Sequence, residues 1–411
     1  MTVHARGARR ALAALAALVL SACGGASSAS SSTPRIDPNA PDERAFQAAL
    51  ARYDAGTAAH AAARLAADPT AQNATAVTEF GAAEGGFHRL LIDFPASVRA
   101  DNAAYLEGRS RYEIGTITGL RIDFEKARTL LEAAIAAHGT AKTMDSMTYF
   151  AGRAIFRIAE VDRAATTDTA AVQAQYALAK AQFVRSVAVN PGAPWGDNAA
   201  YYLGRCDFEI GELGVHPLDP LAKPGSDAAP FDRAEAELAA VPAASTYYDN
   251  ARYYRGRSFF EEPTTSAVDP AAARQANLAS AVGDLATVIG LPGPSSFAVP
   301  ATYWRGRAHY ALAFQGTPVD PVELPLALAD MKAVAPTASV YADNALYFAA
   351  KSYLHLAGGP YCATTRSGDA APASACAALK ELRTRLAASV YVGQAEAYLL
   401  ANGCDPAACP P

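Results

Sequence analysis

Residues 197–211 read D-N-A-A-Y-Y-L-G-R-C-D-F-E-I-G, and the first twelve of these residues recur in recognisable form along the chain. The six copies begin at Asp101, Asp145, Asp197, Asp249, Val299 and Asp343. Counting the first residue as position 1, tyrosine stands at position 5, glycine at 8, a basic residue at 9 and an aromatic residue at 12. Only the last copy departs, with Ala350, Lys351 and Leu354. Starts that lie 44 to 52 residues apart predict a repeat architecture, in which each unit stacks on its neighbours to bury its apolar face.

Each copy predicts an amphipathic helix, which we term helix A. Aspartate opens five of the six copies, and we expect it to be the N-cap, because its carboxylate can accept hydrogen bonds from the free amides of the first turn. Positions 5, 9 and 12 lie on one stripe of such a helix. Glycine inside a helix costs about 1 kcal/mol relative to alanine. Its recurrence at position 8 therefore predicts that a second helix approaches closely there.

The second helix of each unit, helix B, is predicted from amphipathic runs that precede four of the motifs and end in proline, such as 83–95 and 179–191. The links from helix B to the next helix A are short. Longer links, which we expect to be surface loops, join helix A to helix B at 116–122, 162–168, 212–230, 261–269 and 316–322.

The pattern resembles the tetratricopeptide repeat (TPR), which has small, glycine, aromatic and glycine positions on helix A, here Ala199, Gly204, Phe208 and Gly211. The phrase S-x-x-x-D-N-A-x-Y-x-x-G-R, at 97–109 and nearly at 339–351, is similar to repeats of bacterial outer-membrane and envelope proteins. These include the Tol-Pal cell-division coordinator (YbgF type) and the outer-membrane assembly lipoprotein of BamD type. The resemblance covers roughly residues 75–357. It implies an all-α fold, a right-handed α-solenoid of stacked helix pairs.

Residues 1–22 read as a lipoprotein signal peptide. Three arginines precede an apolar run at 11–20 that is too short to span a bilayer. The sequence L-S-A-C at 20–23 resembles a lipobox, which would make Cys23 the lipidated first residue of the mature protein. The alternative is an ordinary signal peptide followed by a chance cysteine. Gly24, where an aspartate would favour the inner membrane, favours the outer one.

Four parts follow from these readings: the signal peptide at 1–22, a flexible tether at 23–41, TPR-like repeats at 42–357 and a C-terminal cap at 358–411. The tether is rich in serine, glycine and alanine and lacks the hydrophobicity to fold. Residues 42–57 read as a degenerate copy of helix A, with aromatic residues at positions 5 and 12.

The cap contains four cysteines, which in an exported protein favour disulfides. Of three possible pairings we prefer the local one, Cys362 with Cys376 and Cys404 with Cys409. Zinc is a weaker reading, because no histidine lies among them and the spacing is not C-x-x-C. Cys206, inside a helix A, is expected to be a small packed residue and not a reactive thiol.

Composition and motifs give no indication of catalysis. The chain has 411 residues, of which 51% are hydrophobic and 18% charged, which suits close helix packing. A net charge of -5 excludes an electrostatic nucleic-acid binder. The sequence contains no G-x-x-x-x-G-K-[ST], H-E-x-x-H or G-x-S-x-G motif. We therefore expect a protein that is not an enzyme, with no metal and no cofactor.

The candidate site is the stripe formed by positions 5 and 9, because the equivalent positions of TPR proteins line a partner-binding groove. An extended peptide carrying carboxylates would suit this row of cations and rings. Charge reversal at Arg205 and Arg257 should then abolish partner capture and leave helicity and melting intact. The residues are Tyr105, Arg109, Tyr149, Arg153, Tyr201, Arg205, Tyr253, Arg257, Tyr303, Arg307, Tyr347 and Lys351.

The alternative is that this stripe is purely architectural. Arg109, Arg205 and Arg257 each precede a glutamate by four residues, so they can neutralise that glutamate along the same helix at a few tenths of a kcal/mol. The aromatic side chains can equally belong to the core. The sequence leaves both readings open.

As a whole, the sequence predicts a lipid-anchored scaffold that binds partner proteins or peptides in the periplasm, in outer-membrane assembly or cell division. We expect it at the periplasmic face of the outer membrane. A second reading is a carrier for a small ligand or glycan in the cell envelope, with the aromatic stripe as a sugar platform.

Overall fold

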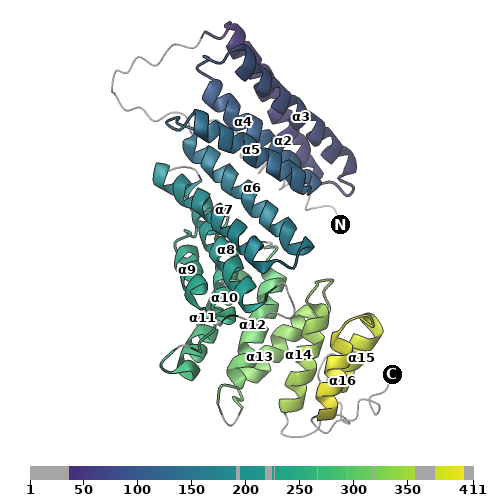
Figure 1. The fold of residues 1–411 in the computed structure, drawn as a ribbon. Helices are drawn as coiled ribbons and strands as arrows, with labels where there is room; N and C mark the ends of the chain where they lie inside the picture. The colour runs from purple at the N-terminus through teal and green to yellow at the C-terminus, as the bar shows by residue number, and fades with distance from the viewer. Residues whose placement is uncertain are drawn as a thin grey trace. The chain divides into compact units, whose positions relative to one another are not determined.

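The computed structural model describes residues 37–190, 195–217, 225, 227–265, 267–293, 295–316, 319–356 and 375–401. These residues form fifteen helices and no strand, which confirms the all-α class (Figure 1). The chain divides into two compact units, Met1–Arg44 and Ala45–Pro411, and the packing described below is that of the second. The predicted signal peptide and the predicted lipidation site, Cys23, lie outside the described residues. No described helix is both long and apolar enough to cross a membrane.

Motif helices alternate with partner helices along the chain. The six motifs lie in α4 (Ala100–Thr118), α6 (Met144–Ala165), α8 (Gly196–Val215), α10 (Tyr248–Glu261), α12 (Ala298–Ala313) and α14 (Ala342–His355). The helices between them are α5 (Arg121–Ala137), α7 (Thr169–Val189), α9 (Ala229–Ala239), α11 (Pro270–Gly290) and α13 (Glu323–Val334). Before them come α2 (Pro41–Ala63) and α3 (Thr70–Asp93), and after them α15 (Ala375–Arg385) and α16 (Tyr391–Ala401).

Helices that follow one another in the chain pack against each other from α3 to α16. The part of α2 in the same compact unit packs on α3, where the ring centroids of Tyr53 and Phe80 lie 5.4 Å apart. Successive motif helices also touch directly: α4 with α6, α8 with α10, α10 with α12, and α12 with α14. The last of them, α14, makes the same kind of contact with α16. The motif stripe therefore lies where neighbouring repeats meet.

The glycine at position 8 lies against the partner helix, as its recurrence predicts. A methyl group added at Gly204 would come within 2.5 Å of Leu238 Cγ on α9. Added at Gly108 it would come within 2.6 Å of Leu131 Cγ on α5, and at Gly256 within 2.8 Å of Leu285 Cγ on α11. The obstacle is mainly a buried side chain of helix B, with backbone atoms slightly farther away. In the last copy Ala350 fits at this position and is buried.

We expect Gly204→Ala to destabilise the protein although alanine is the better helix former. The displaced Leu238 is buried, and overpacking of this kind costs about 1–3 kcal/mol, which exceeds the roughly 1 kcal/mol gained in helix propensity. The matched control is Gly283→Ala in α11, where an added methyl group meets nothing within 4 Å and should stabilise by up to about 1 kcal/mol. Urea unfolding of both variants measures this, and a stabilised Gly204→Ala variant would show that the contact is not tight.

The aspartates at position 1 are not N-caps, so this expectation is wrong. Each motif helix begins one residue earlier, and the residue before it makes no side-chain cap hydrogen bond. The Oδ1 atom of Asp249 instead accepts from the amide of Asn250, at 2.8 Å, inside the first turn. Aspartate N-caps occur on helices B: Asp168 accepts from the Ala171 amide and Asp269 from the Ala272 amide, both at 3.0 Å.

A serine four residues before position 1 organises the approach to most motif helices. Ser245 Oγ accepts from the amide of Tyr247 at 3.1 Å, and Ser295, Ser339 and Ser389 make the same bond two residues on. Ser295 Oγ also donates to Asp249 Oδ2 of the preceding repeat at 2.8 Å. The position-1 aspartate thus links one repeat to the next.

The expanded links are confirmed after α8, α10 and α12, where 216–228, 262–269 and 314–322 lie between helices. The links after α4 and α6 are shorter than predicted. Helix α4 runs to Thr118 and α6 to Ala165, so most of 116–122 and 162–168 is helical or directly adjoins a helix.

Candidate functional site

Five of the six position-5 tyrosines are buried in the core, and Tyr347 is partly exposed. Three of the hydroxyls accept a hydrogen bond from the arginine of the same helix: Arg109 Nη1 to Tyr105 at 2.8 Å, Arg153 Nη1 to Tyr149 at 3.0 Å, and Arg307 Nη1 to Tyr303 at 2.8 Å. The buried rings are Tyr105, Tyr149, Tyr201, Tyr253 and Tyr303. In these three repeats tyrosine and arginine therefore act as one unit.

The next repeat covers five of the six position-5 tyrosines, all but Tyr105, with an aromatic residue two places before its own position 1. Trp195 stacks on Tyr149, with ring centroids 5.1 Å apart and planes at 12°. The same contact recurs in four further pairs: Tyr247 on Tyr201, Phe297 on Tyr253, Tyr341 on Tyr303 and Tyr391 on Tyr347. These covering residues were missed in the sequence, although their aromatic character repeats there.

The position-9 basic residues lie between rings of the two adjacent repeats. The Arg205 guanidinium is 3.6 Å from the centroid of Tyr254, at position 6 of the next copy, and 5.8 Å from that of Phe156, at position 12 of the preceding one. All six basic residues contact a ring at position 12 of the preceding copy and a ring at position 6 of the next copy. The ring pairs are Tyr53 and Phe150 for Arg109, Tyr112 and Tyr202 for Arg153, Phe156 and Tyr254 for Arg205, Phe208 and Trp304 for Arg257, Phe260 and Phe348 for Arg307, and Tyr310 and Tyr398 for Lys351.

We call these six cations and their rings the cation–aromatic ladder. Each contact of this type contributes about 0.5–2 kcal/mol, more where the cation is desolvated. The ladder includes Tyr53 of α2, where the sequence predicts a degenerate helix A. It also includes Tyr398 of α16, which the sequence analysis did not recognise as another copy. Ser389, Tyr391 and Tyr398 give α16 the spacing of the motif helices.

Three cations of the ladder are paired with carboxylates. Arg205 Nε donates to Glu209 Oε1 at 2.6 Å, and Arg109 Nε lies 3.5 Å from Glu113 Oε1. Arg257 Nη2 donates both to Glu261 Oε1 of its own helix, at 3.2 Å, and to Glu212 Oε1 of the preceding repeat, at 2.5 Å. Burial by itself would raise the pKa of Glu212, but Arg257 and Arg163 outweigh it and lower that pKa to about 2.

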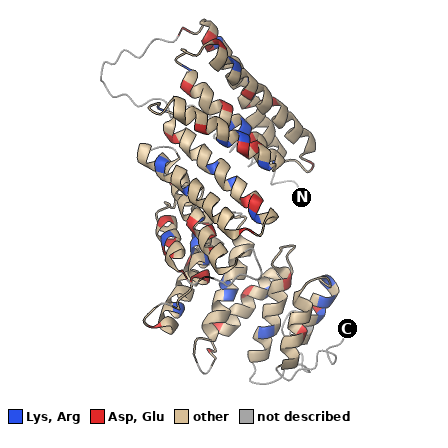
Figure 2. Cartoon of the chain, viewed as in Figure 1, with Lys and Arg blue, Asp and Glu red and all other residues tan. Residues whose placement is uncertain are grey.

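The other three, Arg153, Arg307 and Lys351, have no carboxylate within salt-bridge distance among the described residues. Burial lowers the pKa of Lys351, and the nearby Arg307 lowers it further. Figure 2 shows acidic and basic residues interspersed along the helices, without a long segment of one sign. The difference between paired and unpaired cations therefore arises from individual side chains.

The cysteines are only partly within the described residues. Cys206 is a free, fully buried thiol in α8, as expected of a packing residue, and burial raises its pKa. Cys376 is buried at the start of α15. Cys362, Cys404 and Cys409 lie outside the described residues, so the disulfide pairing stays a prediction.

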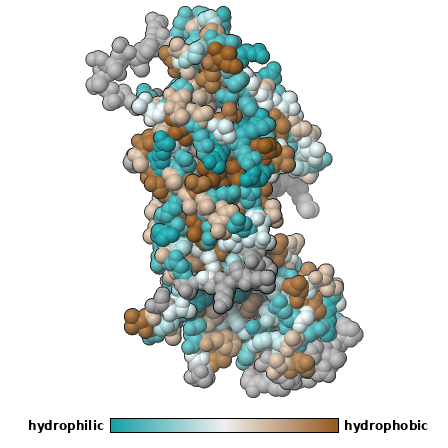
Figure 3. Space-filling view, viewed as in Figure 1, coloured by the Kyte–Doolittle hydropathy of each residue, from teal (hydrophilic) through white to brown (hydrophobic). Residues whose placement is uncertain are grey.

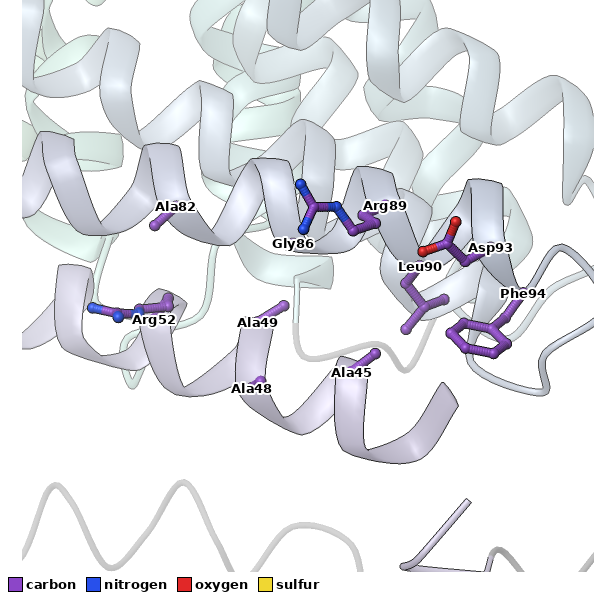
Figure 4. Close-up of a pocket in the computed structure, with 10 residues that line it drawn as sticks. All are labelled: Ala45, Ala48, Ala49, Arg52, Ala82, Gly86, Arg89, Leu90, Asp93 and Phe94. Carbon is purple, nitrogen blue, oxygen red and sulfur yellow. The ribbon is translucent and has the colours of Figure 1, made fainter. Parts of the chain in front are cut away.

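The described residues offer no cluster of three metal-binding side chains, and their hollows are small. A pocket of about 300 Å³ lies between α2 and α3 (Figure 4), where Ala45, Ala48 and Ala49 face Ala82 and Gly86. Arg52, Arg89 and Asp93 line it together with Leu90 and Phe94. The face seen in Figure 3 mixes hydrophobic and hydrophilic side chains. Most of the lining of this pocket is apolar, and Asp93 is the one carboxylate in it.

No family model matches the sequence, and neither does any curated protein. The tetratricopeptide resemblance therefore depends on the repeated residues alone.

Proposed function

We propose that this protein is a non-catalytic, TPR-like α-solenoid scaffold that binds partner proteins or peptides along its layer of motif helices. It acts in the periplasm, in outer-membrane assembly or cell division, anchored by a lipid on Cys23 at the periplasmic face of the outer membrane. The stacked helix pairs form a right-handed solenoid.

One observation carries this proposal: the same side-chain contacts join each repeat to the next from α2 to α16. Because every unit uses its motif helix in the same way, the helices present one extended, quasi-repeating surface, which is the form that repeat proteins use to bind partners. On that surface the ring at position 6 and the basic residue at position 9 remain partly exposed in α8, α10 and α12. Partly exposed arginine and aromatic groups are enriched at protein interfaces.

The test is capture of the intact lipoprotein, cross-linked in cells and purified from the membrane fraction, followed by mass spectrometry. We expect a small, reproducible set of envelope proteins. The matched control is an unrelated lipoprotein expressed at the same level. Equal recovery with both proteins would contradict the scaffold, and co-purification of a small ligand or glycan with no protein would support the carrier reading. Recovery of the protein only from the soluble fraction would contradict the anchor.

A further inference from the structure

We propose that Arg307 and Lys351 form an anion-binding site for a short peptide segment that carries one or two carboxylates. This inference rests on the proposed function, because it names the part of the motif-helix layer that holds the partner.

The two cations share one aromatic ring. The Arg307 guanidinium lies 4.2 Å and the Lys351 Nζ 5.2 Å from the centroid of Phe348. Lys351 Nζ also lies 4.5 Å from the centroid of Tyr398, 5.1 Å from Tyr310 and 5.2 Å from Tyr347. Two positive charges, one from α12 and one from α14, thus lie near the same ring and among further aromatic rings.

No carboxylate balances this pair within the described part of the chain. Arg307 donates to the Tyr303 hydroxyl at 2.8 Å, whereas Arg205 and Arg257 are each neutralised by one or two glutamates. At position 13, which is glutamate in the α8 and α10 copies, α12 has Ala311 and α14 has His355.

Burial disfavours a charged amine, and a nearby like charge repels it. Both effects act on Lys351, whose pKa is lowered first by burial and then by Arg307. Burial and Lys351 in turn lower the pKa of His355. A bound carboxylate would supply the missing negative charge and could accept from the guanidinium in a fork. This end of the ladder is also open to a ligand, because Arg307, Lys351 and Tyr347 are all partly exposed.

A peptide fits better than a dense polyanion. The chain carries a net charge of -5, so a nucleic acid or a sulfated glycan would be repelled at long range. A segment with one or two carboxylates meets little of that repulsion. The surrounding rings can pack against its side chains and backbone.

The experiment measures binding of a fluorescein-labelled hexapeptide, with two glutamates among glycines and alanines, to the full-length protein by fluorescence anisotropy at low ionic strength. We expect Arg307→Gln with Lys351→Gln to weaken binding by at least about tenfold. The control is Lys126→Gln with Arg185→Gln, two exposed cations on α5 and α7, which changes the net charge equally and should bind like the wild type. Equal melting temperatures of the two variants check folding.

A second measurement needs no variant. Acetylation of Lys351 by an amine-reactive reagent, followed by mass spectrometry, should slow when the peptide is present, whereas acetylation of the exposed Lys126 should not. This readout distinguishes a seated peptide from diffuse attraction.

Several outcomes would overturn the assignment: equal binding of the glutamine and wild-type proteins, equal loss in the control variant, equal binding of the same peptide with glutamine in place of both glutamates, or tighter binding of a sulfated oligosaccharide. Retained partner capture from membranes by Arg307→Gln with Lys351→Gln would leave the scaffold standing and remove only this site. Failure of the wild-type protein to capture any envelope protein would instead contradict the scaffold itself.

Discussion

Reversing two charges of the ladder, Arg205→Glu with Arg257→Glu, is expected to abolish cooperative folding. The two side chains are only 15% and 12% exposed, and they face Glu209, Glu212 and Glu261. Breaking one such buried pair costs about 3–5 kcal/mol, so two approach the whole stability of a typical protein, about 5–15 kcal/mol. Far-UV circular dichroism and thermal melting measure the loss.

The matched control is Arg128→Glu with Arg385→Glu, which reverses two exposed arginines, each paired with a glutamate on its own helix. Exposed pairs contribute about 0–1 kcal/mol, so this variant should melt close to the wild type. A wild-type melt for Arg205→Glu with Arg257→Glu would show that the buried pairs are dispensable. The sequence alone predicts an intact fold for that variant, whereas the structure favours unfolding, because Arg257 is bonded to Glu212 of the preceding repeat.

Removing the ring of Tyr149 is expected to cost about 3–5 kcal/mol, the range for a fully buried aromatic side chain replaced by alanine. Its ring is completely buried, and its centroid lies 5.1 Å from Trp195, 5.1 Å from Phe150 and 5.8 Å from Phe183. Tyr149→Ala would therefore open a cavity between two repeats. Urea unfolding followed by circular dichroism measures the change in unfolding free energy.

Two further variants separate the causes. Tyr149→Phe keeps the ring and removes only the acceptor of the Arg153 hydrogen bond, so it should cost about 1 kcal/mol. Tyr347→Ala makes the same truncation at a partly exposed position and should cost less than half as much as Tyr149→Ala. Equal losses at the two tyrosines would mean that the complete burial of Tyr149 contributes little.

Much of the fold could be predicted because the residues that determine packing recur at the same positions of each copy. The period of the motif indicated helix A, proline-terminated runs indicated helix B, and glycine at position 8 indicated the contact between them. Helix starts were less predictable. An aspartate near a helix start reads as a cap, but Asp249 uses Oδ2 to bind Ser295 of the next repeat, and a single helix contains no sign of that bond.

For the candidate site, the sequence predicted which residues lie together but not whether their side chains are exposed. The stripe does bring each tyrosine next to the basic residue four places on, as at Tyr105 and Arg109. The burial of such a tyrosine involves residues of other helices, such as Trp195 of the following repeat over Tyr149. The helical period cannot show this, because it describes one helix at a time. Binding of a partner by the stripe stays a proposal.

The basic residues of the ladder contact rings of their own repeat and of the adjacent repeats. The exception is Arg109, which also lies 5.5 Å from the ring centroid of Trp195, one repeat farther along the chain. Unequal lengths between copies are accommodated between the helices, as at 216–228 between α8 and α9, outside the ladder. A gene encoding such a chain could duplicate or delete one whole unit. At the new junction the basic residue would contact aromatic residues at the same motif positions as before. Growth in length by copying is therefore open to this protein without redesign of its interior.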